Sequence, residues 1–306
     1  MLVIGECIHV ISRDVKTALE TRDKQFLQTL ALNQIENGAH VVDLNIGPQK
    51  KSGPEVMKWA VQTVQEVSDC TLSLDTTNAA AIEAGLGVVK KKAFINSTDA
   101  TQERLQALMP LAAKYKANIV ALTYSGGGLP TTADARIELA SERILPVAAE
   151  LGIPIEDIYL DPLVLTVNGN QDQAIPTIEA VRFFKQMSDP PPKTVCGLSN
   201  ISNSCPKEMR PLLNRVFLTM LLGAGLDSAI VDPMDKDLME VVHVIDSKKA
   251  ATPKQQLYVD IYNAYAAGTP FEPAGVDMNV EELRDIVKTV VILENKTLYA
   301  HGYLRL

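Results

Sequence analysis

The chain repeats one local pattern eight times, in which an apolar run of strand length precedes a longer stretch with helical periodicity. The strand-like runs are residues 2–6, 40–45, 71–75, 93–96, 118–123, 157–162, 193–200 and 227–233. Between them, stretches such as "QERLQALMPLAAKYK" place apolar residues three and four positions apart, on one helical face. Near-continuous apolar strands separated by helices pair in parallel, because the helices then cover the sheet. The pattern therefore predicts an α/β fold, the parallel eight-stranded (β/α)8 TIM barrel, which typically takes about 250 residues.

The chain has 306 residues, and the surplus falls mainly at residues 247–280. This stretch has three prolines and two glycines around one short helical piece, ahead of a final helix from about Val280 to Leu293. Prolines and glycines at this density indicate loops. We therefore predict a single domain over residues 1–306, with residues 247–280 as an insertion in the last βα unit. A surface elaboration is favoured over a lid or an oligomer contact.

Composition and charge exclude several classes of partner. The net charge of −8 argues against a nucleic-acid-binding surface, which needs a basic stripe. No apolar run approaches the length of a membrane span, and the start "MLVIGECIHV" lacks the positive region of a signal peptide. The four cysteines are scattered without a C-x-x-C pair, which suits a reducing compartment. We expect a cytoplasmic protein with no nucleic-acid or membrane partner and no intrinsic metal.

In a parallel barrel, the functional site lies where strands end and the following loops begin. Every predicted strand of this chain ends there in a residue that can form hydrogen bonds, and Lys and Arg are absent from these positions. The residues are Glu6, Asp43, Asn45, Asp75, Asn96, Thr123, Asp161, Asn200 and Asp232. Helix capping or turn formation explains each one alone, but the whole ring favours a binding site.

A ring of carboxylates and carboxamides without cations disfavours phosphate and acidic groups. It suits a planar heterocycle with an amidine-like N–H edge, because one carboxylate accepts two parallel N–H bonds. A divalent metal is the alternative, since Mg²⁺ and Ca²⁺ also prefer oxygen ligands. The asparagines and the lack of a tight D-x-D cluster favour the heterocycle. The stretch "CGLSNISNSC" from Cys196 to Cys205, dense in small hydrogen-bonding side chains, is consistent with a neutral polar ligand.

Five stretches at strand ends resemble the pterin-binding methyltransferases. They are "DLNIGP" from Asp43, "LDTTN" from Leu74, "INST" from Ile95, "DIYLDPL" from Asp157 and "TVCGLSNISNSC" from Thr194. The likeness is closest to the methyltetrahydrofolate:corrinoid-protein methyltransferases, relatives of the folate domain of cobalamin-dependent methionine synthase. It covers nearly the whole chain apart from residues 247–280. It implies a (β/α)8 barrel, usually a homodimer, that moves a methyl group between N5 of tetrahydrofolate and the cobalt of a corrinoid.

The resemblance also implies roles for individual residues. Asn200 would be the catalytic residue that reaches N5, while Asp75, Asn96 and Asp161 would hold the N–H edge of the pterin. The further substrate-binding positions are Glu6, Asp43, Asn45, Gly197, Ser199 and Asn203. The substrate implied is tetrahydrofolate or methyltetrahydrofolate. The D-x-H-x-x-G signature of base-off cobalamin proteins is absent. The corrinoid (cobalamin) is therefore expected on a partner, such as a corrinoid iron–sulfur protein or the corrinoid subunit of a demethylase.

Two stretches depart from the pattern of these relatives. The first strand reads "GECIH" where relatives commonly read G-E-R-x-N, so Glu6 matches but Cys7 and His9 differ. The stretch "PKEMRP" after Cys205 looks longer, which leaves the equivalence of Arg210 open. Two other functions also stay open, a dihydropteroate-synthase-like condensation and a non-catalytic folate-binding or docking subunit. Both directions of methyl transfer are compatible with the sequence, because they share one transition state.

Overall fold

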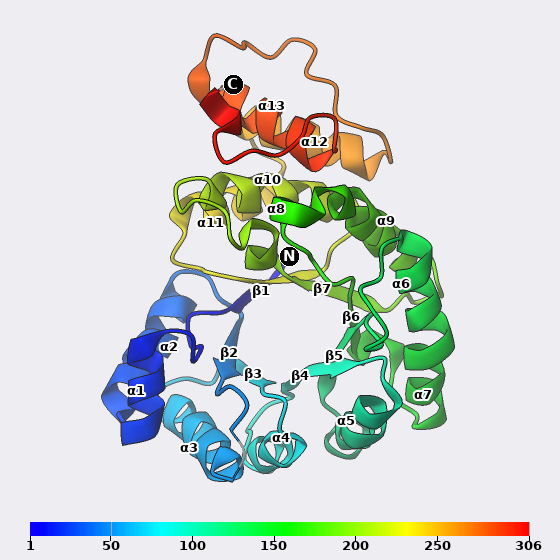
Figure 1. Cartoon of the computed structure of the whole chain (residues 1–306). Helices are drawn as coiled ribbons and strands as arrows, with labels where there is room; N and C mark the ends of the chain where they lie inside the picture. The colour runs from blue at the N-terminus through cyan, green and yellow to red at the C-terminus, as the bar shows by residue number, and fades with distance from the viewer. Residues whose placement is uncertain (50, 306) are drawn as a thin grey trace.

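The computed structural model describes residues 1–49 and 51–305, and its strands form one closed parallel barrel in the order β1 to β8. The strands are β1 Leu2–Gly5, β2 Val41–Asn45, β3 Thr71–Asp75, β4 Phe94–Asp99, β5 Asn118–Leu122, β6 Ile158–Asp161, β7 Lys193–Gly197 and β8 Ser228–Val231. β8 pairs in parallel with β1, from Leu2 beside Ser228 to Gly5 beside Val231, and this pairing closes the barrel. Figure 1 shows the strands around a common centre with the helices outside them. The prediction of a TIM barrel is confirmed.

Helices follow the strands in the alternating order that the sequence predicts. They are α1 Arg13–Thr21, α2 Lys24–Glu36, α3 Gly53–Gln65, α4 Ala79–Leu86, α5 Gln102–Tyr115, α6 Ala133–Leu139, α7 Leu145–Glu150, α8 Val167–Asn170, α9 Ala174–Phe184, α10 Arg210–Gly223, α11 Lys236–Ser247, α12 Pro253–Ala266 and α13 Glu281–Leu293. A short 3-10 helix, η4, spans Leu198–Ser202 directly after β7. In the part of the chain that the structure describes, no helix has the length and apolarity needed to cross a membrane.

The barrel interior is filled with apolar side chains towards the amino ends of the strands. Ile4, Val41, Phe94, Val120 and Val195 form one buried cluster there. The residues between them along each strand face outwards and pack with the helices in two larger clusters. Side chains alternate in direction along a strand, so every second residue packs inside the barrel and the residues between them pack against the helices.

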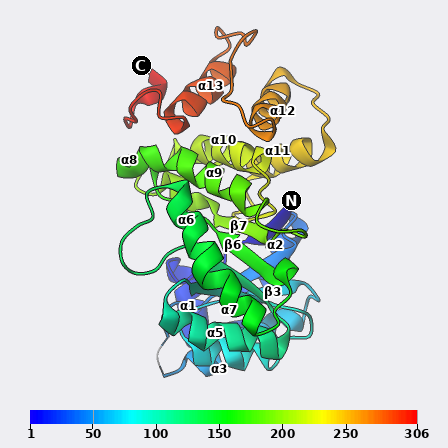
Figure 2. The same cartoon turned by 90° about the vertical axis from the view of Figure 1, so that its right-hand side faces the viewer.

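Helix α10 is nearly apolar on all sides, which predicts burial on both its inner and its outer face. α12 and α13 cover the outer face, and Figure 2 shows them stacked beyond α10 and α11. Five residues of α12 are buried, namely Leu257, Tyr258, Val259, Ile261 and Tyr265. The expectation of a surface elaboration at residues 247–280 is therefore wrong for α12, because this helix belongs to the core. The assignment of the whole chain to a single domain stays a prediction.

The contact between α10 and α12 is close enough to exclude any side chain at Gly223. A Cβ atom added there would lie 2.6 Å from both the Tyr262 carbonyl oxygen and the Tyr265 Cβ. We expect Gly223→Ala to destabilise the fold by about 1–3 kcal/mol, the usual cost of overpacking a core. Denaturant unfolding would measure the change, with Gly127→Ala as control because a Cβ at Gly127 meets no atom within 4 Å. Equal midpoints for Gly223→Ala and the parent chain would contradict the docked position of α12.

Candidate active site

At the carboxyl ends of the strands, the inward-facing positions are occupied by polar residues. Counting in steps of two, Glu6 follows Ile4, Asp43 and Asn45 follow Val41, Asp75 follows Ser73, Asn96 follows Phe94, and Asp161 follows Tyr159. Since side chains alternate along a strand, these residues point to the same interior as the apolar cluster. The interior is therefore apolar at one end of the barrel and polar at the other.

Helix capping does not account for this ring. The residues whose side chains cap helices are others, namely Asp23, Asn78, Thr101, Thr132, Thr166, Asp235 and Thr252. Three ring residues do close a local turn, because Asn45, Asp161 and Asp232 each accept from the backbone N–H two residues on. Even these three keep further side-chain atoms for other contacts. Local structure therefore explains only part of the ring.

Asp43, Asn45, Asp75 and Asn96 form one hydrogen-bonded group, here called the carboxyl–amide cluster. The register of the sheet places Asn45 beside Asp75, and Asp75 beside Asn96. Asn45 Nδ2 donates to Asp75 Oδ2 at 2.6 Å, and Asn96 Nδ2 donates to Asp43 Oδ1 at 3.0 Å. Each carboxyl group is thus matched to one carboxamide, Asp75 to Asn45 on the adjacent strand β2 and Asp43 to Asn96 two strands away on β4.

The two carboxyl groups of this cluster are hard to ionise together. Burial raises the pKa of Asp43 to about 6, although the neighbouring polar side chains of Ser73, Asn96 and Asp75 oppose the shift. Burial and the nearby Asp43 charge raise the pKa of Asp75 well above its ordinary value. Two neighbouring negative charges repel each other, which disfavours ionisation of both carboxyl groups. Near neutral pH the pair is therefore suited to holding one proton. It can then both donate to and accept from a heterocycle.

Glu6 directly follows β1, the strand next to β2, and its side chain contacts the loop after β7. Ser199 Oγ donates to Glu6 Oε2 at 3.2 Å. Burial, together with the charges of Asp232 and Asp43, raises the pKa of Glu6 to about 7 against the opposing bond from Ser199. A carboxyl group with such a pKa exchanges protons near neutral pH.

Asp161, at the end of β6, is a third buried carboxyl group. The Leu163 backbone N–H donates to its Oδ1 at 2.8 Å. Burial raises the pKa of Asp161 to about 7, against the opposing effects of this bond and of the Arg136 charge. Arg136, on α6, is fully buried, and its Nε donates to the Pro162 carbonyl oxygen at 2.6 Å. The remaining oxygen of Asp161 is left for a ligand.

Asn200 occupies η4 directly after β7 and has an exposed side chain. Its Oδ1 accepts from Asn203 Nδ2 at 3.1 Å, which fixes the orientation of the carboxamide. Among the described residues, no acceptor is found for Asn200 Nδ2, so this group can donate to a ligand. A Cβ at Gly197 would lie 3.2 Å from Asn200 Nδ2, and glycine there leaves the amide room to move.

The ring differs from the sequence prediction at some positions. Thr123 is buried and donates to the Asp161 backbone oxygen at 3.0 Å, so it supports β6 and does not face the interior. Asp232 is exposed and accepts from Cys7 Sγ at 3.2 Å. Sequence reasoning missed Arg136, whose place on an amphipathic helix gave no sign of burial. It also missed Ser73, which the two-residue spacing from Asp75 could have revealed.

Comparison with known proteins bears on this arrangement. The profile of a family described as pterin binding enzyme matches residues 14–232. The chain is 28% identical over 249 residues to a methylcorrinoid:tetrahydrofolate methyltransferase of Eubacterium limosum, covering 81% of this chain and 90% of that protein. It is 34% identical over 241 residues to a methionine synthase of Mycobacterium tuberculosis, covering 76% of this chain. The chain spans only 20% of that longer relative.

A solved structure shares the fold. Yersinia pestis DHPS with a pterine-sulfa conjugate matches with a TM-score of 0.57 and 18% identity, over 81% of this chain and 94% of that one. At this identity the likeness concerns architecture alone. The family profile covers most of the chain, from residue 14 to Asp232, so it includes every residue of the polar ring except Glu6. The resemblance seen at the strand ends and the prediction of an enzyme are thereby confirmed, and the chain belongs to the pterin binding enzyme family.

Proposed function

We propose that this protein transfers a methyl group between N5 of tetrahydrofolate and the cobalt of a corrinoid. The observation that carries the proposal is the set of inward carboxyl groups with raised pKa, Asp43, Asp75 and Asp161, flanked by carboxamides. A pterin presents an amidine-like N–H edge beside a carbonyl oxygen. Carboxyl groups that hold some protons near neutral pH can accept from the N–H groups and donate to that oxygen.

The named relatives favour methyl transfer as the chemistry. One acts on methylcorrinoid and tetrahydrofolate by its name, and the other is a methionine synthase. We assign the pterin N–H edge to Asp75, Asn96 and Asp161. Glu6, Asp43, Asn45, Gly197, Ser199 and Asn203 complete the folate site around them. Tetrahydrofolate and the corrinoid are both substrates in this scheme.

Asn200 is the residue that we place at N5. In the direction from folate, Co(I) supplies the electron pair for the new Co–C bond, and the C–N5 bond breaks with its electron pair left on nitrogen. N5 must gain a proton or a hydrogen bond, because an amide anion is a poor leaving group. The free Nδ2 of Asn200 can donate to N5, and its Oδ1 can accept from a protonated N5 if the carboxamide turns. The reverse direction passes through the same transition state.

A condensation on a pterin pyrophosphate fits the structure less well, because that substrate needs free cations. Three arginines lie near the carboxyl ends of the strands, and each donates to backbone carbonyl oxygens. Arg104 bonds Thr77 and Ser97, Arg136 bonds Pro162 and Thr132, and Arg210 bonds Cys205. These guanidinium groups are bonded to loop carbonyl oxygens, which fits a structural role better than pairing with a diphosphate.

The proposed activity is tested by mixing the protein with methyltetrahydrofolate and free cob(I)alamin and following formation of methylcobalamin by absorbance. Turnover supports the proposal. Tight folate binding without turnover would indicate a docking subunit instead. We further propose a separate corrinoid protein as partner, a homodimer and a cytoplasmic location. Copurification with a corrinoid protein and the mass of the assembly in solution would test the first two.

Asp75→Ala tests the folate site. The change removes an acceptor for the pterin N–H edge, but the neighbouring Asp43 can then ionise more easily and partly compensate. We expect folate affinity to fall by about 2 kcal/mol, within the range for a hydrogen bond to a charged group. Calorimetry with methyltetrahydrofolate measures the loss. Unchanged affinity in a folded variant would remove Asp75 from the site.

A further inference from the structure

We propose that Gln171 is a positioning residue, through which the segment after α13 holds the loop that carries Asn200. This inference rests on the proposed function of Asn200. Gln171 opens a short 3-10 helix, η3 Gln171–Gln173, between α8 and α9, and it lies outside the polar ring. Its role would be to fix the geometry of the loop without touching substrate.

Gln171 uses both atoms of its amide group on the end of α13 and the segment that follows. Its Nε2 donates to the carbonyl oxygens of Ile292 at 2.7 Å and Thr297 at 2.5 Å. Its Oε1 accepts from the Tyr299 backbone N–H at 2.6 Å. The residue is only 9% exposed, so water is largely excluded as a replacement partner. Gln171 therefore ties residues 292–299 firmly to the α8 region.

The same α8 region holds the loop after η4. Thr166 Oγ1 donates to the Asn203 carbonyl oxygen, and Asn168 Nδ2 donates to the Ser204 carbonyl oxygen at 3.2 Å. Asn203 in turn donates through its side chain to Asn200 Oδ1. The segment of residues 166–171 thus has hydrogen bonds to residues 292–299 at one end and to the loop that carries Asn200 at the other.

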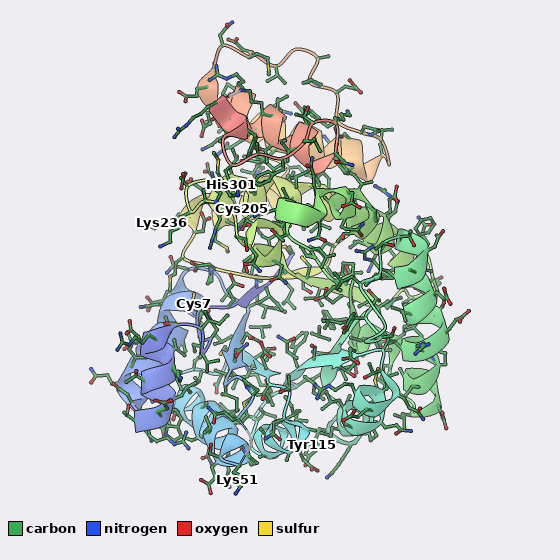
Figure 3. The ribbon with its side chains drawn as sticks, in the orientation of Figure 1. Cys7, Lys51, Tyr115, Cys205, Lys236 and His301 are labelled. Atoms are coloured by element: carbon green, nitrogen blue, oxygen red, sulfur yellow. The ribbon has the colours of Figure 1, made fainter. Side chains whose placement is uncertain are left out.

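Side chains of the segment after α13 also pack together and join the buried cluster that contains residues of the loop region. The ring of Tyr299 lies 5.8 Å from the rings of both His301 and Tyr303. Tyr299 itself packs against that buried cluster, which includes Leu198, Ile201 and Cys205 of the loop region. Figure 3 shows both labelled residues, Cys205 and His301, on the side of the molecule that carries the C-terminal helices. The loop from β7 to α10 is thereby enclosed from two sides.

This support comes from outside the region that the family profile matches, which ends at Asp232. Residues beyond Asp232 thus reach back to a loop of the shared barrel. A carboxamide that acts only in the transition state depends on its placement, because an error of about 1 Å can cost a large factor in rate. Loosening the loop should therefore lower kcat more than it raises KM.

The test substitutes Gln171→Met, which keeps the length of the side chain but removes its hydrogen bonds. Gln65→Met is the matched control. Gln65 is also 9% exposed, and its amide bonds the Val88 carbonyl oxygen at 3.0 Å and the Lys90 backbone N–H at 2.6 Å, near the amino end of β4. Asn168→Ala is a milder second variant, which removes one bond to the loop and leaves the buried site intact. Melting temperature, steady-state kinetics with cob(I)alamin and amide hydrogen exchange are measured for all three.

We expect the two buried glutamine variants to lose similar stability, whereas only Gln171→Met lowers kcat, by about tenfold with KM changed less than about twofold. Hydrogen exchange at residues 198–205 should rise in Gln171→Met and Asn168→Ala but not in Gln65→Met. In an Asn200→Ala background, Gln171→Met should cause little further loss of rate. Unchanged exchange at residues 198–205 in Gln171→Met would overturn the inference. The exchange measurement needs no turnover, so failure of the proposed methyl transfer would be recognised separately, in the parent protein.

Discussion

Asn200→Ala is expected to lower kcat for methyl transfer by about 10²–10³, the scale for losing one preorganised donor. As the C–N5 bond breaks, its electron pair is left on N5, which then requires a hydrogen bond. The carboxamide therefore stabilises the transition state more than it stabilises bound folate. Binding of methyltetrahydrofolate should therefore weaken much less than kcat falls. Single-turnover rates with cob(I)alamin, together with calorimetric affinities, measure the two effects.

Other roles for Asn200 give different results. A passive contact in the pocket would weaken binding and kcat/KM equally and leave kcat unchanged. A purely structural role in the turn would cost about 1 kcal/mol of stability and little rate. Asn37→Ala is a suitable control, because Asn37 ends α2 and its side chain donates to the Asn33 carbonyl oxygen, far from the polar ring. Either alternative outcome would contradict the assignment of Asn200 to N5.

Asp161→Asn is expected to stabilise the folate-free protein at pH 8 by about 4 kcal/mol, since the pKa of Asp161 is raised by about three units and one unit corresponds to about 1.4 kcal/mol. Burial raises the pKa of Asp161 from its ordinary value of 3.8 to about 7, so the folded chain holds this proton more tightly than the unfolded chain does. That contribution to stability is complete below about pH 4 and is lost as the pH rises through about 7. Asparagine keeps an oxygen for the Leu163 N–H but never ionises.

The gain in stability should therefore vanish on acidification. Denaturant unfolding at pH 4 and pH 8 measures it, with Asp14→Asn as the control because Asp14 is exposed on α1. The variant should also lose folate affinity, since the amide offers a weaker acceptor to the pterin N–H edge. Equal stability of Asp161→Asn and the parent protein at pH 8 would show that the carboxylate ionises without cost in the folded state. If Asp161→Asn is more stable but binds folate less tightly, then the carboxylate of Asp161 serves binding at a cost in stability.

The barrel and the ring could be predicted from the sequence because both depend on local patterns. Apolar runs of strand length give the strands, and the period of two places Glu6, Asp43 and Asp75 on the inner face. Thr123 was misplaced because a strand end one residue longer or shorter reverses the direction of a side chain. The side chain of Thr123 therefore points away from the interior, because the position that faces inwards on β5 is one residue from the predicted one.

Features that depend on distant contacts could not be predicted. Arg136 has the sequence context of a surface residue on an amphipathic helix, and only the packing of α6 against the loop after β6 buries it. Gln171 contacts residues more than a hundred positions later in the chain. α12 was expected on the surface because its loops are rich in proline and glycine, whereas burial of the nearly apolar α10 required a helix to cover it. The sequence of α10 contained that signal.

The apolar cluster at the amino end of the barrel closes one end of the interior, so ligands enter and leave only over the polar ring. In the proposed reaction, the pterin binds to groups that lie down in this interior, whereas cobalt arrives on another protein too large to enter. Folate must then be seated before the corrinoid protein covers the opening, and it can depart only after that protein has left. The kinetic consequence is a compulsory order, in which a corrinoid protein bound too early acts as an inhibitor competitive with folate.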